Sequence, residues 1–360
     1  MKNTIEQIVN IEGKFSMRQL ASAVWPLIES QSGITEVIDQ LKASLGNNYR
    51  KLTYSILRNA FLIELVKVPK IETTKFRVRW FDQLNNDPRY CSFDECLLIA
   101  KDLLTTLPVW LETPVHKECM TLSFSDGMIP YESPLDYVRR LTQQNRLHQK
   151  GNLKWFYDEL ILRTLKLRRY LMDDTTSPDK KFFGTVLTDK IKVKTYLTDR
   201  VQTGDHKTNR EKRWETHPCS VHFAERSVCM AIEYALVTQI CAFEGFPPTS
   251  LHQLQEDNIL PHDLSTALCP ITGDELSYET FRNELLNPTH GKSSFHVGHL
   301  NPLKLNNDDG NGGHTSDNIS WITADGNRIQ GSLSLGDVRI LIQRISENYN
   351  RHNWWPQVSS

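Results

Sequence analysis

The chain has 360 residues, with 42 Lys and Arg against 43 Asp and Glu, so its formal net charge at pH 7 is −1. This length predicts two or three domains, each with its own hydrophobic core, and the composition is ordinary for a soluble globular protein. The sequence has no apolar run long enough to span a membrane, and residues 1–6 lack the apolar core of a signal peptide. We therefore exclude a membrane protein and expect a cytoplasmic one.

Residues 1 to about 70 have apolar side chains at helical spacing in three segments, the first of which ends near Gly33. Three short helices fit either a helix-turn-helix unit that enters a DNA groove or a small bundle without such a role, and both readings stay open. The apolar positions that define the segments are Leu20, Val24, Leu27 and Ile28, then Val37, Ile38, Leu41 and Leu45, then Leu52, Ile56, Leu57, Phe61 and Leu62.

The next stretch predicts a strand, a helix and a proline-containing connection. Phe76–Trp80 alternates apolar and basic residues, which is typical of a half-exposed strand, and Cys96–Leu107 has the pattern of a helix. Residues 109–135 contain several prolines and follow Pro108, so we expect them to cross between modules.

Positive charge is concentrated between residues 139 and 215, where the sequence has 19 Lys and Arg but 10 Asp and Glu. Leu153–Met172 predicts a helix with one basic side, and Lys190–Lys194 alternates as a strand with a lysine-rich face would. Clustered Lys and Arg are what contacts with DNA phosphates need, whereas the alternative is a solvated face with ordinary charge fluctuation. The candidates for phosphate contacts in this segment are Arg168, Arg169, Lys192 and Lys194.

Two longer helices are predicted toward the C-terminus. Ser220–Phe243 is mostly apolar, ends before Gly245 and would support a C-terminal module. Leu335–Tyr349 is the last predicted helix. The residues of this helix that we expect to pack inward are Val338, Leu341, Ile342 and Ile345.

Between these two helices the sequence has the order strand, loop, strand, helix. Phe295–Leu300 is a short apolar run, and Ile319–Thr323 is a second one, rich in β-branched and aromatic residues, in which Trp321 is expected in the core. A polar, glycine-rich loop at residues 306–313 lies between them. Asp325 is a plausible N-cap for the helical turn that follows.

The polar residues of this region fit the hydrolysis of a phosphodiester, which needs an activated water, a neutralised phosphate and a stabilised leaving oxygen. His299, at the end of the first strand, can take the proton of a water at neutral pH. Asn327, at the start of the helix, offers one hard oxygen to a divalent cation. Asn318, at the start of the second strand, can hydrogen-bond across the loop and fix the histidine. The order therefore predicts a one-metal nuclease site.

At these residues, over about 265–345, the chain resembles the HNH, or ββα-metal, nuclease family. The family pattern is an Asp-His pair, a trailing Pro, a glycine-containing loop, an Asn before an apolar strand, and an Asn or His in the helix. The resemblance implies an α+β fold, with a helical N-terminal recognition region and a C-terminal ββα-metal module. It also implies a general base, an Asn that positions it, and a ligand for one Mg²⁺ or Mn²⁺ per active site. The matched positions, in order, are His299, Pro302, Gly312, Gly313, Asn318 and Asn327.

One position departs from the family pattern, because the metal-binding Asp is Gly298 here and has no side chain to donate. His296 lies two residues earlier, on the same side of a strand, and is the replacement that we favour. Asp308 or Asp309 could instead reach in from the loop. In the third reading the metal rests on Asn327 with waters alone.

Two further residues near the motif are candidates for contact with nucleic acid. His314 stands among glycines, where we expect a solvated loop position, although contact with a phosphate is also open. Arg328 either contacts a phosphate or faces solvent at the start of the helix.

The cysteines point away from a structural metal. Relatives in the family often carry paired Cys-x-x-Cys motifs that bind zinc near the module, and the sequence has none. Its seven cysteines are odd in number and irregularly spaced, so we expect neither a structural zinc nor a disulfide framework, but free thiols in a reducing compartment.

The sequence thus predicts a mainly helical domain at residues 1–135, a basic DNA-contacting segment at 136–217 and an HNH catalytic domain at 218–360. Some 220 residues before the module are more than cutting alone needs, which favours target recognition. We expect a sequence-specific endonuclease for double-stranded DNA, of the type II restriction kind used in host defence. A palindromic target predicts a homodimer with two sites. The alternatives are a modification-dependent, nicking or homing HNH nuclease, or a non-cleaving DNA-binding protein with a decayed metal site.

Overall fold

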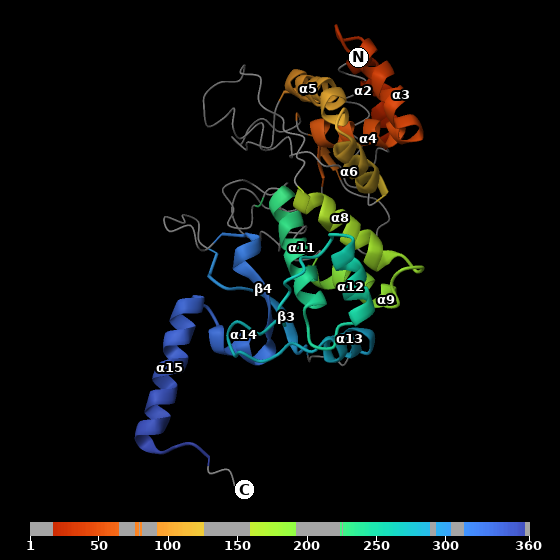
Figure 1. Cartoon of the computed structure of the whole chain (residues 1–360). Helices are drawn as coiled ribbons and strands as arrows, with labels where there is room; N and C mark the ends of the chain where they lie inside the picture. The colour runs from red at the N-terminus through yellow and green to blue at the C-terminus, as the bar shows by residue number, and fades with distance from the viewer. Residues whose placement is uncertain are drawn as a thin grey trace. The chain divides into compact units, whose positions relative to one another are not determined.

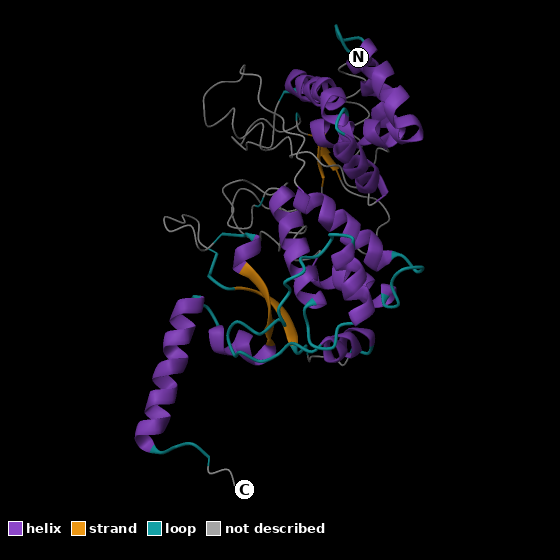
Figure 2. Ribbon diagram, in the orientation of Figure 1, coloured by secondary structure: helices purple, strands orange, loops and turns teal. Residues whose placement is uncertain are grey.

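The computed structural model describes residues 17–64, 76–78, 80, 92–125, 159–191, 224, 226–288, 293–303 and 313–356. These residues are mostly helical, with two short antiparallel hairpins, so the fold is of the α+β kind (Figures 1 and 2). The chain divides into two compact units, each made of two separate stretches of the sequence. Unit 1 comprises residues 1–169 and 193–230, and unit 2 comprises residues 170–192 and 231–360.

The first helices of unit 1 confirm the three helices predicted for the N-terminal region. Their apolar faces meet in one core that includes Leu20, Ile28, Ile34 and Phe61, all fully buried. Burial recurs every three or four residues, as expected for helices that cover one another. The elements are α2 (Met17–Glu29), α3 (Thr35–Leu45), η1 (Gly46–Asn48) and α4 (Tyr49–Phe61).

A second pair of helices replaces part of the connection expected at residues 109–135. α5 (Phe93–Leu111) begins with a capping box at Ser92 and continues through Pro108, and α6 (Pro114–Ser125) follows at once. The prediction was therefore wrong for residues 109–125, and the remaining ten lie outside the described residues. The apolar face of α5, buried on both sides of its proline, keeps the chain helical there. A proline in the first turn of α6 needs no hydrogen-bond partner for its nitrogen.

The remaining elements of unit 1 are a hairpin and the beginnings of two longer helices. β1 (Leu62–Glu64) pairs antiparallel with β2 (Phe76–Val78), which confirms the strand predicted there. α8 (Glu159–Met172) and α11 (Arg226–Cys241) correspond to the predicted helices at 153–172 and 220–243, and the boundary between the units falls within both.

Unit 2 begins with a helical segment where a strand was expected. α9 (Lys180–Thr185) continues into the π-helix η3 (Val186–Ile191), so the predicted strand is wrong at Lys190 and Ile191, whereas residues 192–194 lie outside the described residues. Val186, Leu187 and Ile191 are the buried residues of η3, and this spacing buries one side of a helix rather than alternate residues of a strand.

A partly buried hydrogen-bonded group ties this segment to α13 (Tyr278–Leu286). The Asp179 carboxylate accepts a hydrogen bond of 2.8 Å from the Tyr278 hydroxyl and one of 2.6 Å from Nε of Arg282. Burial, together with the neighbouring Asp179 carboxylate, raises the pKa of Tyr278 well above its ordinary value, so the hydroxyl stays protonated and keeps donating.

The second hairpin packs on α11 through its central tryptophan. Trp321 is fully buried, as predicted, and its indole N–H donates to the carbonyl of Leu236 at 2.9 Å. Gln239 accepts from the backbone N–H of Trp321 at 3.0 Å and from the hydroxyl of Ser320 at 3.2 Å. The hairpin consists of β3 (Phe295–His299) and β4 (Ile319–Thr323), and η5 (Ser316–Asn318) directly precedes β4. Two aromatic rings of the hairpin pack with two rings from outside it, and the four residues are Phe243, Phe281, Phe295 and Trp321.

Three more helices complete unit 2: α12 (Pro248–Glu256), α14 (Ala324–Gln330) and α15 (Leu335–His352). α15 confirms the last predicted helix, but within unit 2 it extends away from the hairpin (Figure 1). Of its residues only Val338 is buried, and Ile345 is 44% exposed, so the prediction that Ile345 packs inward was wrong. No helix in the described part of the chain is long and apolar enough to cross a membrane.

Candidate functional site

Both strands and the helix of the predicted order are present, whereas residues 304–312, which include most of the predicted loop, lie outside the described residues. β3 and β4 pair antiparallel, with Phe295 opposite Thr323 and His299 opposite Ile319. α14 follows β4 directly and contacts both strands. Its N-cap is Thr323, whose hydroxyl accepts from the backbone N–H of Gly326, so the prediction of Asp325 as the cap was wrong by two residues. The helix therefore starts at the residue that follows the strand.

Asn318 joins the two strand ends through its amide group. Its side chain is 3% exposed, and its Oδ1 accepts from the backbone N–H of Asn301 at 2.7 Å. Its Nδ2 donates to the carbonyl of Asn301 at 2.9 Å and to that of Gly313 at 2.8 Å. Asn318 therefore holds the segment just after His299 and the end of the loop at the same time.

Gln330 is a residue of the site that the sequence did not identify. Its side chain is 4% exposed and its Nε2 donates to the carbonyls of His299 at 2.9 Å and Leu300 at 3.0 Å. The signal was present in the helical period, since Gln330 lies one turn after Gly326 on the buried face of α14. Gly331, at φ +54°, then ends the helix in a backbone conformation that favours glycine.

His314 is not the solvated loop residue that was expected, because it is 6% exposed. Its Nδ1 lies 3.1 Å from Nε2 of His299, at hydrogen-bond distance. We call the set of His299, His314, Asn318 and Gln330 the strand-end network. Its members come from β3, the segment before η5, the end of η5 and the end of α14, and they meet where β3 stops.

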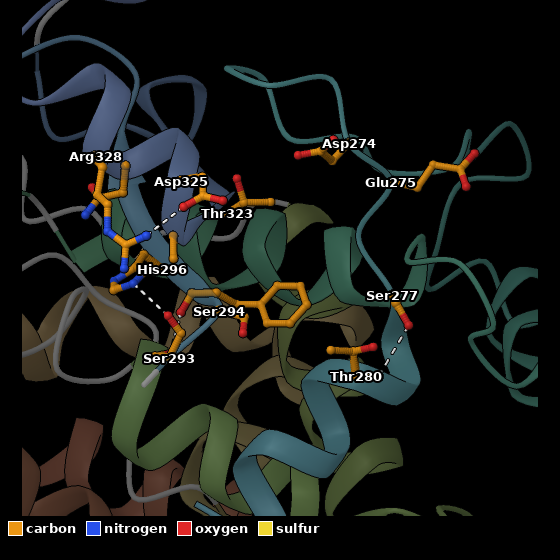
Figure 3. Close-up of a pocket in the computed structure, with 13 residues that line it drawn as sticks. Asp274, Glu275, Ser277, Thr280, Ser293, Ser294, His296, Thr323, Asp325 and Arg328 are labelled. Atoms are coloured by element: carbon orange, nitrogen blue, oxygen red, sulfur yellow. Dashed lines mark hydrogen bonds and ion pairs between the residues drawn. The ribbon is translucent and has the colours of Figure 1, made fainter. Parts of the chain in front are cut away.

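A second group of polar residues lines an open pocket of about 660 Å³ between β3, α14 and α13. His296 from β3 and Arg328 from α14 lie on the same side of it (Figure 3). Nε2 of His296 lies 3.0 Å from the carbonyl of Ser293, and Arg328 forms a 2.6 Å ion pair with Asp325. We call His296, Asn327 and Arg328 the pocket group. His299 and Asn318 are not among the residues that line this pocket.

The strand geometry explains why the two groups are separate. His296 and His299 are three residues apart in β3, and successive side chains of a strand point to opposite faces. His296 shares its face with Gly298, as the sequence predicted. Gly298 is itself closely packed, because a Cβ there would collide with Cδ1 of the buried Ile322 and lie 3.2 Å from its Cγ1. The packing of Ile322 thus occupies the space that a side chain at this position would need.

The pocket group has donor atoms that fit a divalent cation. An Nε2–H of His296 that donates to the Ser293 carbonyl leaves the lone pair of the ring on Nδ1, and this is the usual arrangement of a metal-ligating imidazole. Asn327 is exposed, so that its amide oxygen can serve as a second ligand. Among the described residues no three His, Cys, Asp or Glu side chains gather in one place, and Asp308 and Asp309 lie outside them. A cation held here would therefore take most of its ligands from water and phosphate.

The predicted basic residues are only partly within the described chain. On α8, Arg169 is exposed and Arg168 is half-buried, while Arg163 and Lys166 pair with Glu159 at 2.8 Å and with Glu118 at 3.1 Å. These ion pairs neutralise part of the basic side of the helix. Lys192 and Lys194, the other candidates, fall outside the described residues. No disulfide joins any two of the five described cysteines, Cys96, Cys119, Cys229, Cys241 and Cys269, which are all buried.

Comparisons with known proteins add little. The sequence matches no protein family and no curated protein. Among solved structures, a type II restriction endonuclease aligns over 57% of this chain and 88% of its own, with 15% sequence identity and a TM-score of 0.28. A similarity at this score carries no argument about fold or activity.

Proposed function

We propose that the β3–β4–α14 module is a ββα-metal nuclease site that hydrolyses phosphodiester bonds in double-stranded DNA. The observation that carries the proposal is the buried Asn318 amide, which joins the two strand ends beside His299 while Asn327 lies on the helix that follows. The three residues follow the His–Asn–Asn order, with the first on β3, the second directly before β4 and the third on α14. The family assignment rests on these residues alone.

In this proposal His299 is the general base that takes the proton of the attacking water. Asn318 holds the chain after it, and Gln330 holds its carbonyl, so the imidazole has a fixed position. Nδ1 of His296 and the amide oxygen of Asn327 would hold one Mg²⁺ or Mn²⁺. When bound, such a cation would neutralise the scissile phosphate and stabilise the leaving 3′ oxygen. By family resemblance the products carry 5′-phosphate and 3′-hydroxyl ends.

The separation of the two groups restricts where the scissile phosphate of the substrate can bind. Because His296 and His299 belong to opposite faces of β3, the attacking water and the cation can serve one phosphate only if that phosphate lies across the strand end. Gln330 and Asn327 are one helical turn apart on α14, so the same helix carries the residue that binds the carbonyl of His299 and the proposed metal ligand.

We further propose that the enzyme is sequence-specific, of the type II restriction kind, and acts as a homodimer. The support is the existence of a second, largely helical unit that cutting does not require. In this reading Arg328, Arg168, Arg169, Lys192 and Lys194 contact the nucleic acid, whereas His314, which is 6% exposed, is not placed on that surface. A modification-dependent, nicking or homing HNH nuclease, and a non-cleaving DNA-binding protein with a decayed metal site, are the competing functions.

The test is cleavage of phage-sized linear DNA and supercoiled plasmid with Mg²⁺, Mn²⁺ or chelator, comparing the wild type with His299→Ala. His252→Ala is the matched control, since His252 is an exposed histidine of α12 in the same unit. We expect discrete bands from the wild type and the control, none with chelator, and a rate at least about 100-fold lower for His299→Ala.

Other outcomes identify the competing functions. A smear of products contradicts site-specific cutting but keeps the nuclease, and nicked plasmid alone indicates a nicking enzyme. Cleavage of methylated DNA only would indicate a modification-dependent enzyme. Binding without cleavage of either DNA in any metal contradicts the nuclease proposal and leaves the DNA-binding protein.

A further inference from the structure

The second histidine of the strand-end network has no role in the predicted chemistry, yet it is well placed. His314 is 6% exposed, and its Nδ1 lies 3.1 Å from Nε2 of His299, with the two rings tilted by 54° and their centroids 5.3 Å apart. We infer that His314 is a positioning residue that fixes the tautomer of His299, an inference that rests on the proposed function.

The hydrogen bond between two imidazoles has one proton and therefore two arrangements. If Nε2 of His299 donates to Nδ1 of His314, the lone pair of His299 is on Nδ1, where it can accept the proton of a water. If His314 donates, the Nε2 lone pair of His299 is used within the pair and its Nδ1 carries a proton. Only the first arrangement makes His299 a base.

The surroundings of His314 hold it at hydrogen-bond distance from His299. His314 is 6% exposed, and a neutral imidazole has one donor and one acceptor nitrogen, so its Nδ1 can accept from His299. Its backbone is held as well, because Asn318 donates to the carbonyl of Gly313, the preceding residue. The same amide binds both backbone groups of Asn301, two residues after His299. One buried side chain therefore sets the distance between the two rings.

The pairing also matters after proton transfer. When His299 takes a proton on Nδ1, the bond from its Nε2–H to His314 becomes charge-assisted and shortens, which stabilises the imidazolium. A third group that orients and stabilises a catalytic histidine has the same effect in other hydrolytic sites. Here that third group is a neutral imidazole rather than a carboxylate.

Two substitutions separate the hydrogen bond from packing. His314→Phe keeps a ring of similar size but has no acceptor, whereas His314→Asn places an oxygen where Nδ1 was. The first measurement is the ¹⁵N spectrum of the histidine rings, with the signals of His299 assigned by their loss in His299→Ala. We expect the Nε2–H tautomer in the wild type and in His314→Asn, and a mixture or the Nδ1–H tautomer in His314→Phe.

The second measurement is cleavage by the same proteins. We expect kcat to fall by about 100-fold in His314→Phe, with DNA affinity in chelator unchanged, and to recover at least about tenfold in His314→Asn. A wild-type His299 in the Nδ1–H tautomer, or a tautomer unaffected by His314→Phe, would overturn the inference. The ring spectrum does not depend on activity, so a wild type that binds but never cleaves DNA contradicts the proposed function separately.

Discussion

The strand-end network and the pocket group lie on the same hairpin and helix but are held in different ways. In the network, His314, Asn318 and Gln330 are each less than a tenth exposed, and their hydrogen bonds go to the protein itself. In the pocket group, Asn327 and Arg328 are exposed, and His296 is only half-buried. The network fixes where a histidine lies, whereas the pocket presents side chains to solvent, where a ligand can reach them.

This difference predicts that substitutions in the two groups affect different properties, the stability of the fold in one case and ligand binding in the other. Removing a member of the network leaves buried partners without hydrogen bonds and lowers stability. Removing a member of the pocket group changes little in the fold and acts on what binds.

Asn318→Ala should have the largest effect. It removes three hydrogen bonds from a buried amide and leaves two carbonyls and one N–H unpaired at the strand ends. We expect the free energy of unfolding to fall by about 3 kcal/mol, measured by urea denaturation followed by circular dichroism. Asn283→Ala, at an exposed position of α13, is the control and should change it by less than about 0.5 kcal/mol. Equal effects for the two variants would remove the argument that the network is what holds the site.

Gln330→Met should have the next largest effect, because it keeps the length of the side chain but cannot donate to the carbonyls of His299 and Leu300. We expect a loss of about 2 kcal/mol in the free energy of unfolding. If the proposed function holds, kcat should fall while KM stays constant, since the base moves and the binding surface does not. Gln253→Met on the exposed face of α12 is the control for the side-chain exchange. A change confined to KM would contradict a positioning role.

A substitution at Gly298, which shares its face of β3 with His296, should have the third largest effect on stability. Gly298→Ala forces a Cβ against Cδ1 of Ile322, and we expect a loss of about 1–2 kcal/mol by overpacking. Ile322→Val removes that methyl group, so the double variant should be less destabilised than the sum of the single variants. Gly336→Ala is the control, because its nearest neighbour is a Ser334 hydroxyl at 3.9 Å. Additive effects would mean that Ile322 does not determine the choice of glycine.

Local patterns predicted much of this fold and of the candidate site. Helical spacing gave the N-terminal helices, and the run of residues at 319–323 gave β4 with its buried Trp321. Asn318 and Asn327 were found because their order along the chain fits a known chemistry. These features depend on periods of two or four residues and on residue type, which a sequence displays directly.

The residues that were missed depend on tertiary contacts. Gln330 bonds to the carbonyl of His299, 31 positions earlier in the sequence. His314 is buried beside His299, although the glycines next to it in the sequence are typical of an exposed loop. Lys190 and Ile191, the end of η3, were predicted to start a strand because Lys and apolar residues alternate from there on, although the buried side chains of η3 follow a helical spacing. In each case a contact formed by distant residues outweighed the local pattern.

Arg328→Ala, a substitution in the pocket group, should have the smallest effect on stability. Its ion pair with Asp325 joins two side chains that are each 76% exposed, so its loss should change the free energy of unfolding by less than about 0.5 kcal/mol. Under the proposed function, however, Arg328 contacts phosphate, and affinity for DNA should fall several-fold with a shallower dependence on salt. Arg344→Ala, an exposed arginine of α15, matches it in charge. If both variants weaken DNA binding equally, the effect is one of net charge, and the pocket group is not the surface that receives the phosphate.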